Sequence, residues 1–173
     1  IVADEIINRV AQSGLKTIDL EDYYIRGPRV ILDIKDWLFQ GLILREKDFR
    51  EQIKNHAWDG YENKYVAITC SADAIVPTWA YILLAAALQP YAKRVVFGSL
   101  EELESIMFDE ILSKLDLKEY QDERIIIKGC GNLPVPRNAF VKLTELLRPV
   151  AKSIMYGEAC STVPIFKRGK EEL

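Results

Sequence analysis

The sequence contains few cysteines, a single histidine and no long run of apolar residues. Three cysteines in 173 residues are an odd number, unlike the paired disulfide framework of a small secreted protein. No stretch approaches the ~20 apolar residues that a transmembrane helix needs, and residues 1–5 lack the basic and apolar regions of a signal peptide. We therefore expect a cytoplasmic protein that has no contact with a membrane.

The charge balance argues against one class of partner. The chain carries 23 Lys and Arg against 26 Asp and Glu, a formal net charge of −3, and its basic residues are scattered among acidic ones. A nucleic-acid-binding domain usually gathers its basic residues on one face. The densest basic cluster, residues 167–170, is followed at once by two glutamates and is typical of a solvated terminus. We expect no nucleic-acid partner.

Short motifs that identify a reaction are also missing. The sequence has no GxGxxG, no P-loop and no GxSxG. Its composition, 49% hydrophobic and 28% charged, is that of a globular protein. The length is within the usual range of about 100–200 residues for one domain. The sequence thus predicts a single folded domain, residues 1–173, without naming its chemistry.

Strand and helix patterns alternate from residue 64 onward. Such alternation is the signature of right-handed βαβ crossovers. We therefore predict an α/β fold with three layers, a mainly parallel sheet with helices on both faces. The last strand leads into a short extended tail at 163–166. With the N-terminal extension we also expect a small antiparallel addition to one edge of the sheet. The predicted strands are residues 65–69, 94–97, 124–128 and 152–156, and the predicted helices are residues 77–89, 100–115 and 136–147.

Residues 1–62 are less regular. We predict that they form an N-terminal extension, packed on a βα core of residues 63–166. No repeat of solenoid length is visible. The elements predicted in the extension are helices at 1–10, 37–42 and 46–55 and strands at 17–20 and 29–34.

All three cysteines follow closely after a predicted strand. Cys70, Cys130 and Cys160 each lie within a few residues of a strand's carboxyl end, and binding sites of open α/β sheets lie beyond these ends. If the strands before Cys70 and Cys130 are neighbours, about 4.8 Å apart, both thiolates can reach one metal at Zn–S bonds of ~2.3 Å. The placement predicts a three-thiolate site for zinc, iron or an iron–sulfur cluster.

Three thiolates leave one coordination position for an oxygen or nitrogen ligand. Asp73 and Glu158 are candidates because they are close in sequence to Cys70 and Cys160. A carboxylate there can bind the metal or accept a hydrogen bond from a ligand. The third candidate is His56, which is less favoured because a lone histidine is more often structural than ligating.

Two other interpretations of the cysteines remain open. Cys70 and Cys130 each precede a predicted helix by a few residues, a position that can activate a thiol as the nucleophile of a thiol-dependent enzyme. Alternatively, the cysteines are small buried residues of an interaction module and take part in no chemistry.

Five segments of the chain carry a resemblance to a known family: Asp19–Tyr23, Asp33–Gly41, Ala67–Pro77, Lys128–Cys130 and Ser153–Ser161. Together they resemble a bacterial family known as domain of unknown function 2480. The resemblance covers nearly the whole chain, from residue 3 to about 166, and implies no established activity. It does imply an association with iron–sulfur assembly genes, and hence a protein partner in metal or iron–sulfur assembly. The oligomeric state stays open.

Overall fold

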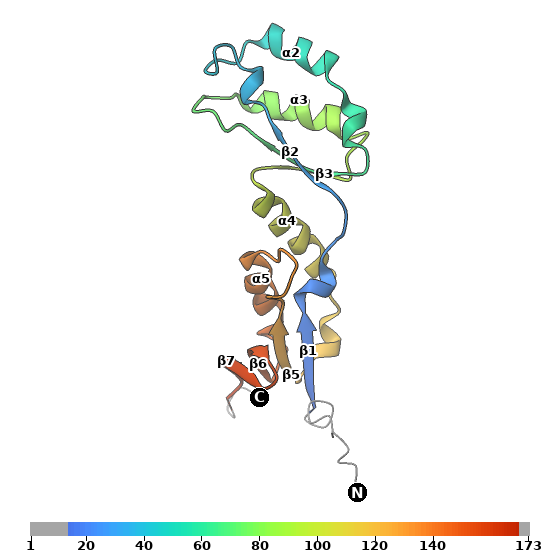
Figure 1. Ribbon diagram of the computed structural model, residues 1–173. Helices are drawn as coiled ribbons and strands as arrows, with labels where there is room; N and C mark the ends of the chain where they lie inside the picture. The colour runs from blue at the N-terminus through green and yellow to red at the C-terminus, as the bar shows by residue number, and fades with distance from the viewer. Residues whose placement is uncertain (1–13, 170–173) are drawn as a thin grey trace, which may run out of the picture. The chain divides into compact units, whose positions relative to one another are not determined.

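The computed structural model describes residues 14–169 (Figure 1). The helix predicted at 1–10 and the last residue of the basic cluster, Lys170, lie outside these residues. The strands are β1 (Leu15–Asp19), β2 (Arg29–Asp33), β3 (Tyr65–Thr69), β4 (Arg94–Phe97), β5 (Arg124–Lys128), β6 (Ser153–Glu158) and β7 (Ser161–Lys167). The α-helices are α2 (Glu46–Asn55), α3 (Thr78–Leu88), α4 (Leu100–Leu112) and α5 (Arg137–Leu147). Short 3-10 helices are η1 (Leu20–Tyr23), η2 (Lys35–Trp37), η3 (Trp58–Tyr61) and η4 (Leu117–Tyr120).

The strands form two sheets, with the orders β1-β5-β6-β7 and β2-β3-β4. The described residues correspondingly divide into two compact units: unit 1 is residues 14–24 and 108–169, and unit 2 is residues 25–107. The α/β class and the mainly parallel strands are confirmed. The extended tail expected at 163–166 is part of β7, which runs antiparallel to β6. None of the helices in residues 14–169 has the length and apolar composition that crossing a membrane requires. The cytoplasmic location stays a prediction.

The expectation of one continuous sheet is wrong. Strand β5 pairs with β1, and β3 pairs with β2, so each central strand takes a neighbour from the part of the chain that was predicted to be an extension. Strand–helix alternation does not reveal such pairings, because it reports only on elements that are consecutive in sequence. The single-domain organisation stays a prediction, since two compact units can still fold cooperatively.

In unit 2, helices cover both faces of the sheet, as predicted. Alternate residues of β3 point to opposite faces. Val66 and Ile68 are buried in a core cluster with residues of α3 and α2, such as Leu84 and Phe49. Ala67 belongs to a second cluster, together with residues from the first half of α4. This sandwich explains why β3 is apolar at nearly every position.

In unit 1, the face of the sheet that carries Ile125 and Ile127 is covered by α5 and the second half of α4. The packing residues include Leu143 from α5 and Phe108 from α4. All four side chains are almost fully buried. Each such burial stabilises the fold by roughly 1.5–3 kcal/mol, and the resulting layer fixes where the carboxyl ends of β1, β5 and β6 lie.

Local elements agree with the sequence patterns with one exception. The predicted helix 46–55 is α2, whereas the helix predicted at 37–42 does not form. Instead, η2 is followed by a turn in which Phe39 and Ile43 make an isolated β-bridge. Gln40 and Gly41 have φ of 52° and 69°, left-handed values that end a right-handed helix.

The two units repeat one pattern of a first strand followed by a βαβ segment. Residues 65–99 of unit 2 and 124–158 of unit 1 align without a gap at an offset of 59 positions. The first strands are β2 and β1, which pair in the same register with β3 and β5. Ten of the 35 aligned positions are identical: Ile68/Ile127, Val76/Val135, Pro77/Pro136, Ala80/Ala139, Leu84/Leu143, Leu88/Leu147, Pro90/Pro149, Ala92/Ala151, Lys93/Lys152 and Gly98/Gly157.

The backbone repeats as well. Asn63 and Asp122 precede the two βαβ segments at the same offset, and both have φ of 59°. Gly98 and Gly157 have φ of 135° and 118° at equivalent positions near the other end. Sequence and backbone together identify an internal duplication. Its two copies are interleaved, because β1 and β2 both come before the two βαβ segments, so the chain has no simple tandem repeat.

Candidate functional site

Cys130 lies beyond the carboxyl end of β5, where a glycine lets the chain turn. Gly129 has φ of 150°, and a Cβ placed on it would stand 2.8 Å from the Leu20 Cβ. No larger residue fits there without displacing the start of η1. The turn leaves Cys130 exposed beside the ends of β1 and β6.

The thiol of Cys130 is paired with a tyrosine. Its Sγ stands 2.8 Å from the Tyr156 Oη, a hydrogen bond in which either atom can donate. Tyr156 comes from β6, and its ring packs edge-on against Phe140 of α5, with 5.9 Å between the centroids. The hydrogen bond with Cys130, followed by partial burial, raises the pKa of Tyr156. Tyr156 therefore keeps its proton at neutral pH and can donate it to a thiolate.

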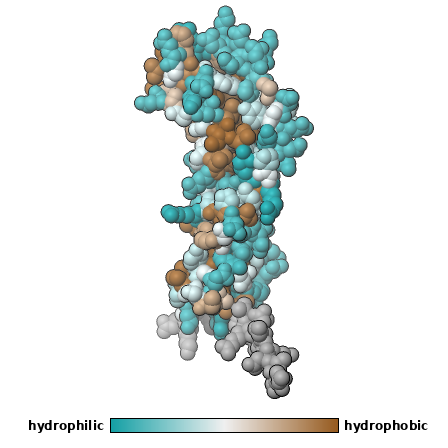
Figure 2. All heavy atoms as spheres, in the orientation of Figure 1, coloured by the Kyte–Doolittle hydropathy of each residue, from teal (hydrophilic) through white to brown (hydrophobic). Residues whose placement is uncertain are grey.

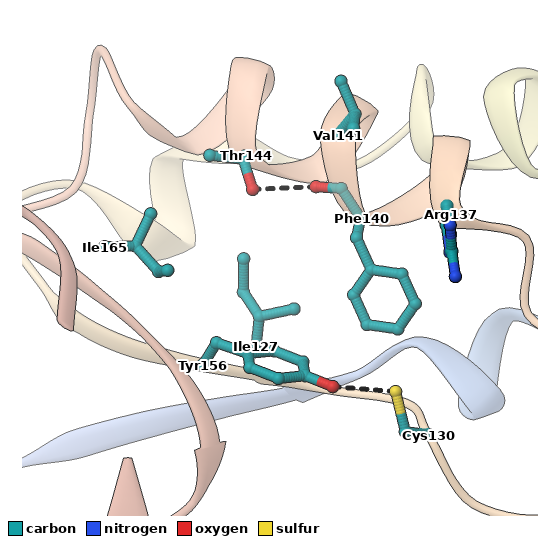
Figure 3. Close-up of a pocket in the computed structure, with 8 residues that line it drawn as sticks. All are labelled: Ile127, Cys130, Arg137, Phe140, Val141, Thr144, Tyr156 and Ile165. Atoms are coloured by element: carbon teal, nitrogen blue, oxygen red, sulfur yellow. Dashed lines mark hydrogen bonds between the residues drawn. The ribbon is translucent and has the colours of Figure 1, made fainter. Parts of the chain in front are cut away.

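An apolar hollow opens on one side of this pair (Figure 3). Its volume is about 550 Å³, within the usual range for small-molecule sites. Figure 3 shows the Phe140 and Arg137 side chains extending from α5 toward the layer that holds Cys130 and Tyr156. The lining residues are Ile127, Cys130, Arg137, Phe140, Val141, Thr144, Tyr156 and Ile165.

Apolar side chains on the rim of this hollow reach the solvent. Val141 of α5 is 64% exposed, and Ile165 of β7 is 51% exposed. Apolar atoms are also visible at several places on the surface in Figure 2. The Thr144 hydroxyl is already engaged, since it donates to the Phe140 carbonyl at 2.7 Å. Arg137 is therefore the charged group of a largely apolar surface.

A second, polar hollow of about 350 Å³ is also lined by Cys130 and Tyr156. Lys128 stands 3.4 Å from Asp19 and 3.8 Å from Glu158. Glu158, and then Asp19, raise the pKa of Lys128, so its ammonium group stays charged. The lining residues are Asp19, Glu21, Lys128, Gly129, Cys130, Gly131, Tyr156, Gly157 and Glu158.

Of the six residues proposed from sequence, two line the same hollow. Cys130 and Glu158 both face the polar hollow, and Cys160 lies in the exposed turn between β6 and β7. The assumption that the strands before Cys70 and Cys130 are neighbours is wrong, because β3 and β5 belong to different sheets. In the described part of the chain, no group of three or more His, Cys, Asp or Glu side chains is arranged as a metal site. The three-thiolate site stays a prediction.

The other three residues, Cys70, Asp73 and His56, belong to unit 2. Cys70 is half-buried against the core of that unit, and its thiol donates to the Ala72 carbonyl at 3.9 Å. His56 Nε2 stands 2.9 Å from the Tyr61 hydroxyl. Partial burial lowers the pKa of His56, and its ring packs against aromatic side chains. These contacts give His56 a structural role.

Comparison of equivalent positions in the two units distinguishes residues that the fold needs from residues that only the site of unit 1 has. Two apolar positions of the apolar hollow keep an apolar residue in unit 2, where Ile127 corresponds to Ile68 and Val141 to Ile82. The chemistry-bearing positions differ, and the pairs are Cys130/Ser71, Tyr156/Phe97 and Arg137/Thr78. A fold needs its apolar positions in both copies, so the polar groups that unit 1 alone carries are candidates for function.

Sequence patterns did not single out Tyr156, Arg137 or Lys128. Tyr156 and Lys128 belong to predicted strands and Arg137 to a predicted helix. Two of them lie in segments that carry the family resemblance, but that resemblance assigns no role to either residue. The duplication provides a signal for Tyr156, because the equivalent residue of unit 2 is Phe97, which has no hydroxyl.

Comparison with known proteins gives one match. The model of a family described as "Protein of unknown function (DUF2480)" matches residues 4–168, nearly the whole chain. No curated protein and no solved structure matches the chain.

Proposed function

The chain belongs to the DUF2480 family, whose description names no activity, and we propose that its unit 1 is a small-molecule-binding module with a reactive thiol. Cys130 is the nucleophile and Tyr156 is its hydrogen-bond donor. In the reacting step, a carboxylate of the polar hollow or water takes the thiol proton. The sulfur electron pair then forms a bond to one carbon of an activated carbon–carbon double bond in the ligand. The π bond breaks, its electron pair moves to the neighbouring carbon, and that carbon takes a proton from water.

One observation carries this proposal: the sulfur of Cys130 lies 2.8 Å from a tyrosine hydroxyl, where two hollows meet. A hydroxyl that donates to a thiolate stabilises the reactive form of the sulfur. The apolar hollow offers space for a ligand beside the sulfur.

The proposal can be tested by measuring the reaction rates of the three thiols, with Cys160 as a control in the same unit. Cys160 is also exposed but makes no hydrogen bond within residues 14–169, whereas Cys70 is half-buried. With an excess of a chromogenic disulfide at pH 7, we expect one fast thiol among three. The Cys130→Ser variant should lose the fast phase and Cys160→Ser should keep it. A fast phase that survives Cys130→Ser overturns the proposal.

Metal binding, the function expected from the sequence, is a second candidate. It is favoured by the presence of a thiol and a carboxylate, Cys130 and Glu158, in one hollow. Against it, Lys128 already contributes the positive charge that Asp19 and Glu158 require. In this reading, the protein supplies zinc, iron or an iron–sulfur cluster to a partner in metal assembly.

Metal analysis separates the two candidates. The full chain should be purified anaerobically without a histidine tag, and its zinc and iron measured. Stoichiometric metal that disappears in the Cys130→Ser variant would support the metal function over the thiol function. A metal content well below one per chain, together with a fast Cys130, supports the thiol function.

A further inference from the structure

We propose that the apolar hollow binds a monocarboxylate with an apolar body, and that Arg137 recognises the carboxylate. This inference rests on the proposed function, because it names the ligand class of the same site. The carboxylate lies at the end of the hollow that holds Arg137 and Cys130 (Figure 3). The apolar body extends along Phe140 toward Ile165.

Of the polar side chains that line the hollow, Arg137 is the one whose polar group is not already hydrogen-bonded to another lining residue. The hydroxyls of Thr144 and Tyr156 are already hydrogen-bonded. Within residues 14–169, the Arg137 guanidinium makes no ion pair, yet it lines the hollow. A guanidinium presents two parallel N–H groups that match the two oxygens of a carboxylate. Arg137 is therefore the group available to select a ligand.

The charge of the adjoining polar hollow favours a carboxylate over a phosphate as the ligand group that Arg137 binds. The adjoining polar hollow carries Asp19, Glu21 and Glu158 against one Lys128, so its side chains have a net negative charge at pH 7. A phosphate monoester bears a charge of about −2 near neutral pH and is repelled more strongly than a monoanion. One arginine beside a negatively charged hollow fits a single negative charge.

The duplication supports the assignment independently. At the position of Arg137, unit 2 has Thr78, which is likewise the first residue of its helix. The fold therefore does not need an arginine there. Unit 2 also lacks a counterpart of Ile165, because its chain continues from β4 into α4, whereas unit 1 adds β7. Arg137 and Ile165 are therefore both specific to unit 1, the unit that carries Cys130.

Octanoate is a suitable probe, with 1-octanol and octyl phosphate as matched compounds. Binding to the full chain can be followed through the methyl NMR signals of Ile127, Val141 and Ile165. We expect octanoate to shift these signals saturably and to bind about fivefold more tightly than 1-octanol, because Arg137 is exposed and solvent screening weakens an exposed ion pair. Octyl phosphate should bind more weakly than octanoate.

Two variants complete the test. Arg137→Thr, which installs the residue of unit 2, should reduce octanoate affinity to that of 1-octanol and leave 1-octanol binding unchanged. Arg50→Thr removes one exposed positive charge from α2 and should have no effect. Equal affinity for octanoate and 1-octanol, tighter binding of octyl phosphate, or native octanoate affinity in Arg137→Thr would overturn the inference.

The test also distinguishes failure of the inference from failure of the proposed function. The Cys160→Ser variant should bind octanoate as the native protein does, because Cys160 does not line the hollow. A fast Cys130 without octanoate binding refutes only the ligand class. Octanoate binding with an unreactive Cys130 refutes the thiol function.

Discussion

Replacement of Tyr156 by phenylalanine removes one hydroxyl and leaves the ring. Unit 2 carries Phe97 at the equivalent position, and Phe97 packs edge-on against Tyr81 as Tyr156 does against Phe140. The strand position therefore accommodates phenylalanine. We expect Tyr156→Phe to fold normally and to unfold within a degree or two of the native protein.

The magnitude follows from the hydrogen bond to the sulfur. A hydrogen bond to a charged group contributes about 1.5–3 kcal/mol when protected from water. Cys130 is exposed, so solvent screening reduces this figure to about 1 kcal/mol. Loss of that stabilisation should slow the reaction of Cys130 with iodoacetamide roughly fivefold at pH 7.

The assay is a time course of iodoacetamide labelling, resolved by peptide mass spectrometry. Labelling of Cys160 in the same sample controls for reagent and pH. The reasoning is refuted if Tyr156→Phe leaves the Cys130 rate unchanged, or if it slows Cys130 and Cys160 equally.

Further predictions concern both units. The NMR titration of His56, the only histidine, should have its midpoint below 6.5, because burial lowers its pKa. Neutral His56 therefore stabilises the folded protein above pH 6.5, and this contribution is lost as the pH falls through the pKa of the folded state. In urea titrations, the free energy of unfolding of the His56→Gln variant should lack this part of the pH dependence. Burial, followed by a hydrogen bond with Tyr23, raises the pKa of Tyr120 to about 12. The contribution of Tyr120 to stability should therefore be lost as the pH rises from 10 to about 12. In thermal unfolding at these pH values, the Tyr120→Phe variant should not show this decrease. Leu84→Ala should cost about 2–5 kcal/mol in urea unfolding, because Leu84 is fully buried in unit 2, while the Cys130 labelling rate stays unchanged. A slower Cys130 in the refolded variant would contradict the local account of its reactivity.

The element pattern was largely predictable from sequence, whereas the pairing of strands was not. Strands such as β3 and β5 are apolar because both of their faces are covered, and that signal lies within five residues. The partners β1 and β2 pair with strands far away in the chain. Sequence periodicity reports the face that a strand buries but carries no information about which strand lies beside it.

Part of the candidate site was predictable from local sequence, and part depended on the pairing of strands. A cysteine just after an apolar strand indicates the carboxyl edge of a sheet, and this located Cys130 correctly. Tyr156 could not be identified by that rule, because a tyrosine within a strand is ordinary. Its role depends on β5 and β6 being neighbours, a fact of tertiary structure.

The most direct test of the central claim is a labelling experiment with limiting reagent. One equivalent of iodoacetamide per chain is allowed to react to completion at pH 7, and the label on each of the three cysteines is counted by mass spectrometry. The account predicts that Cys130 carries most of the label, with Cys160 well behind and Cys70 nearly unlabelled. Equal labelling of Cys130 and Cys160, or preferential labelling of Cys70, would contradict it.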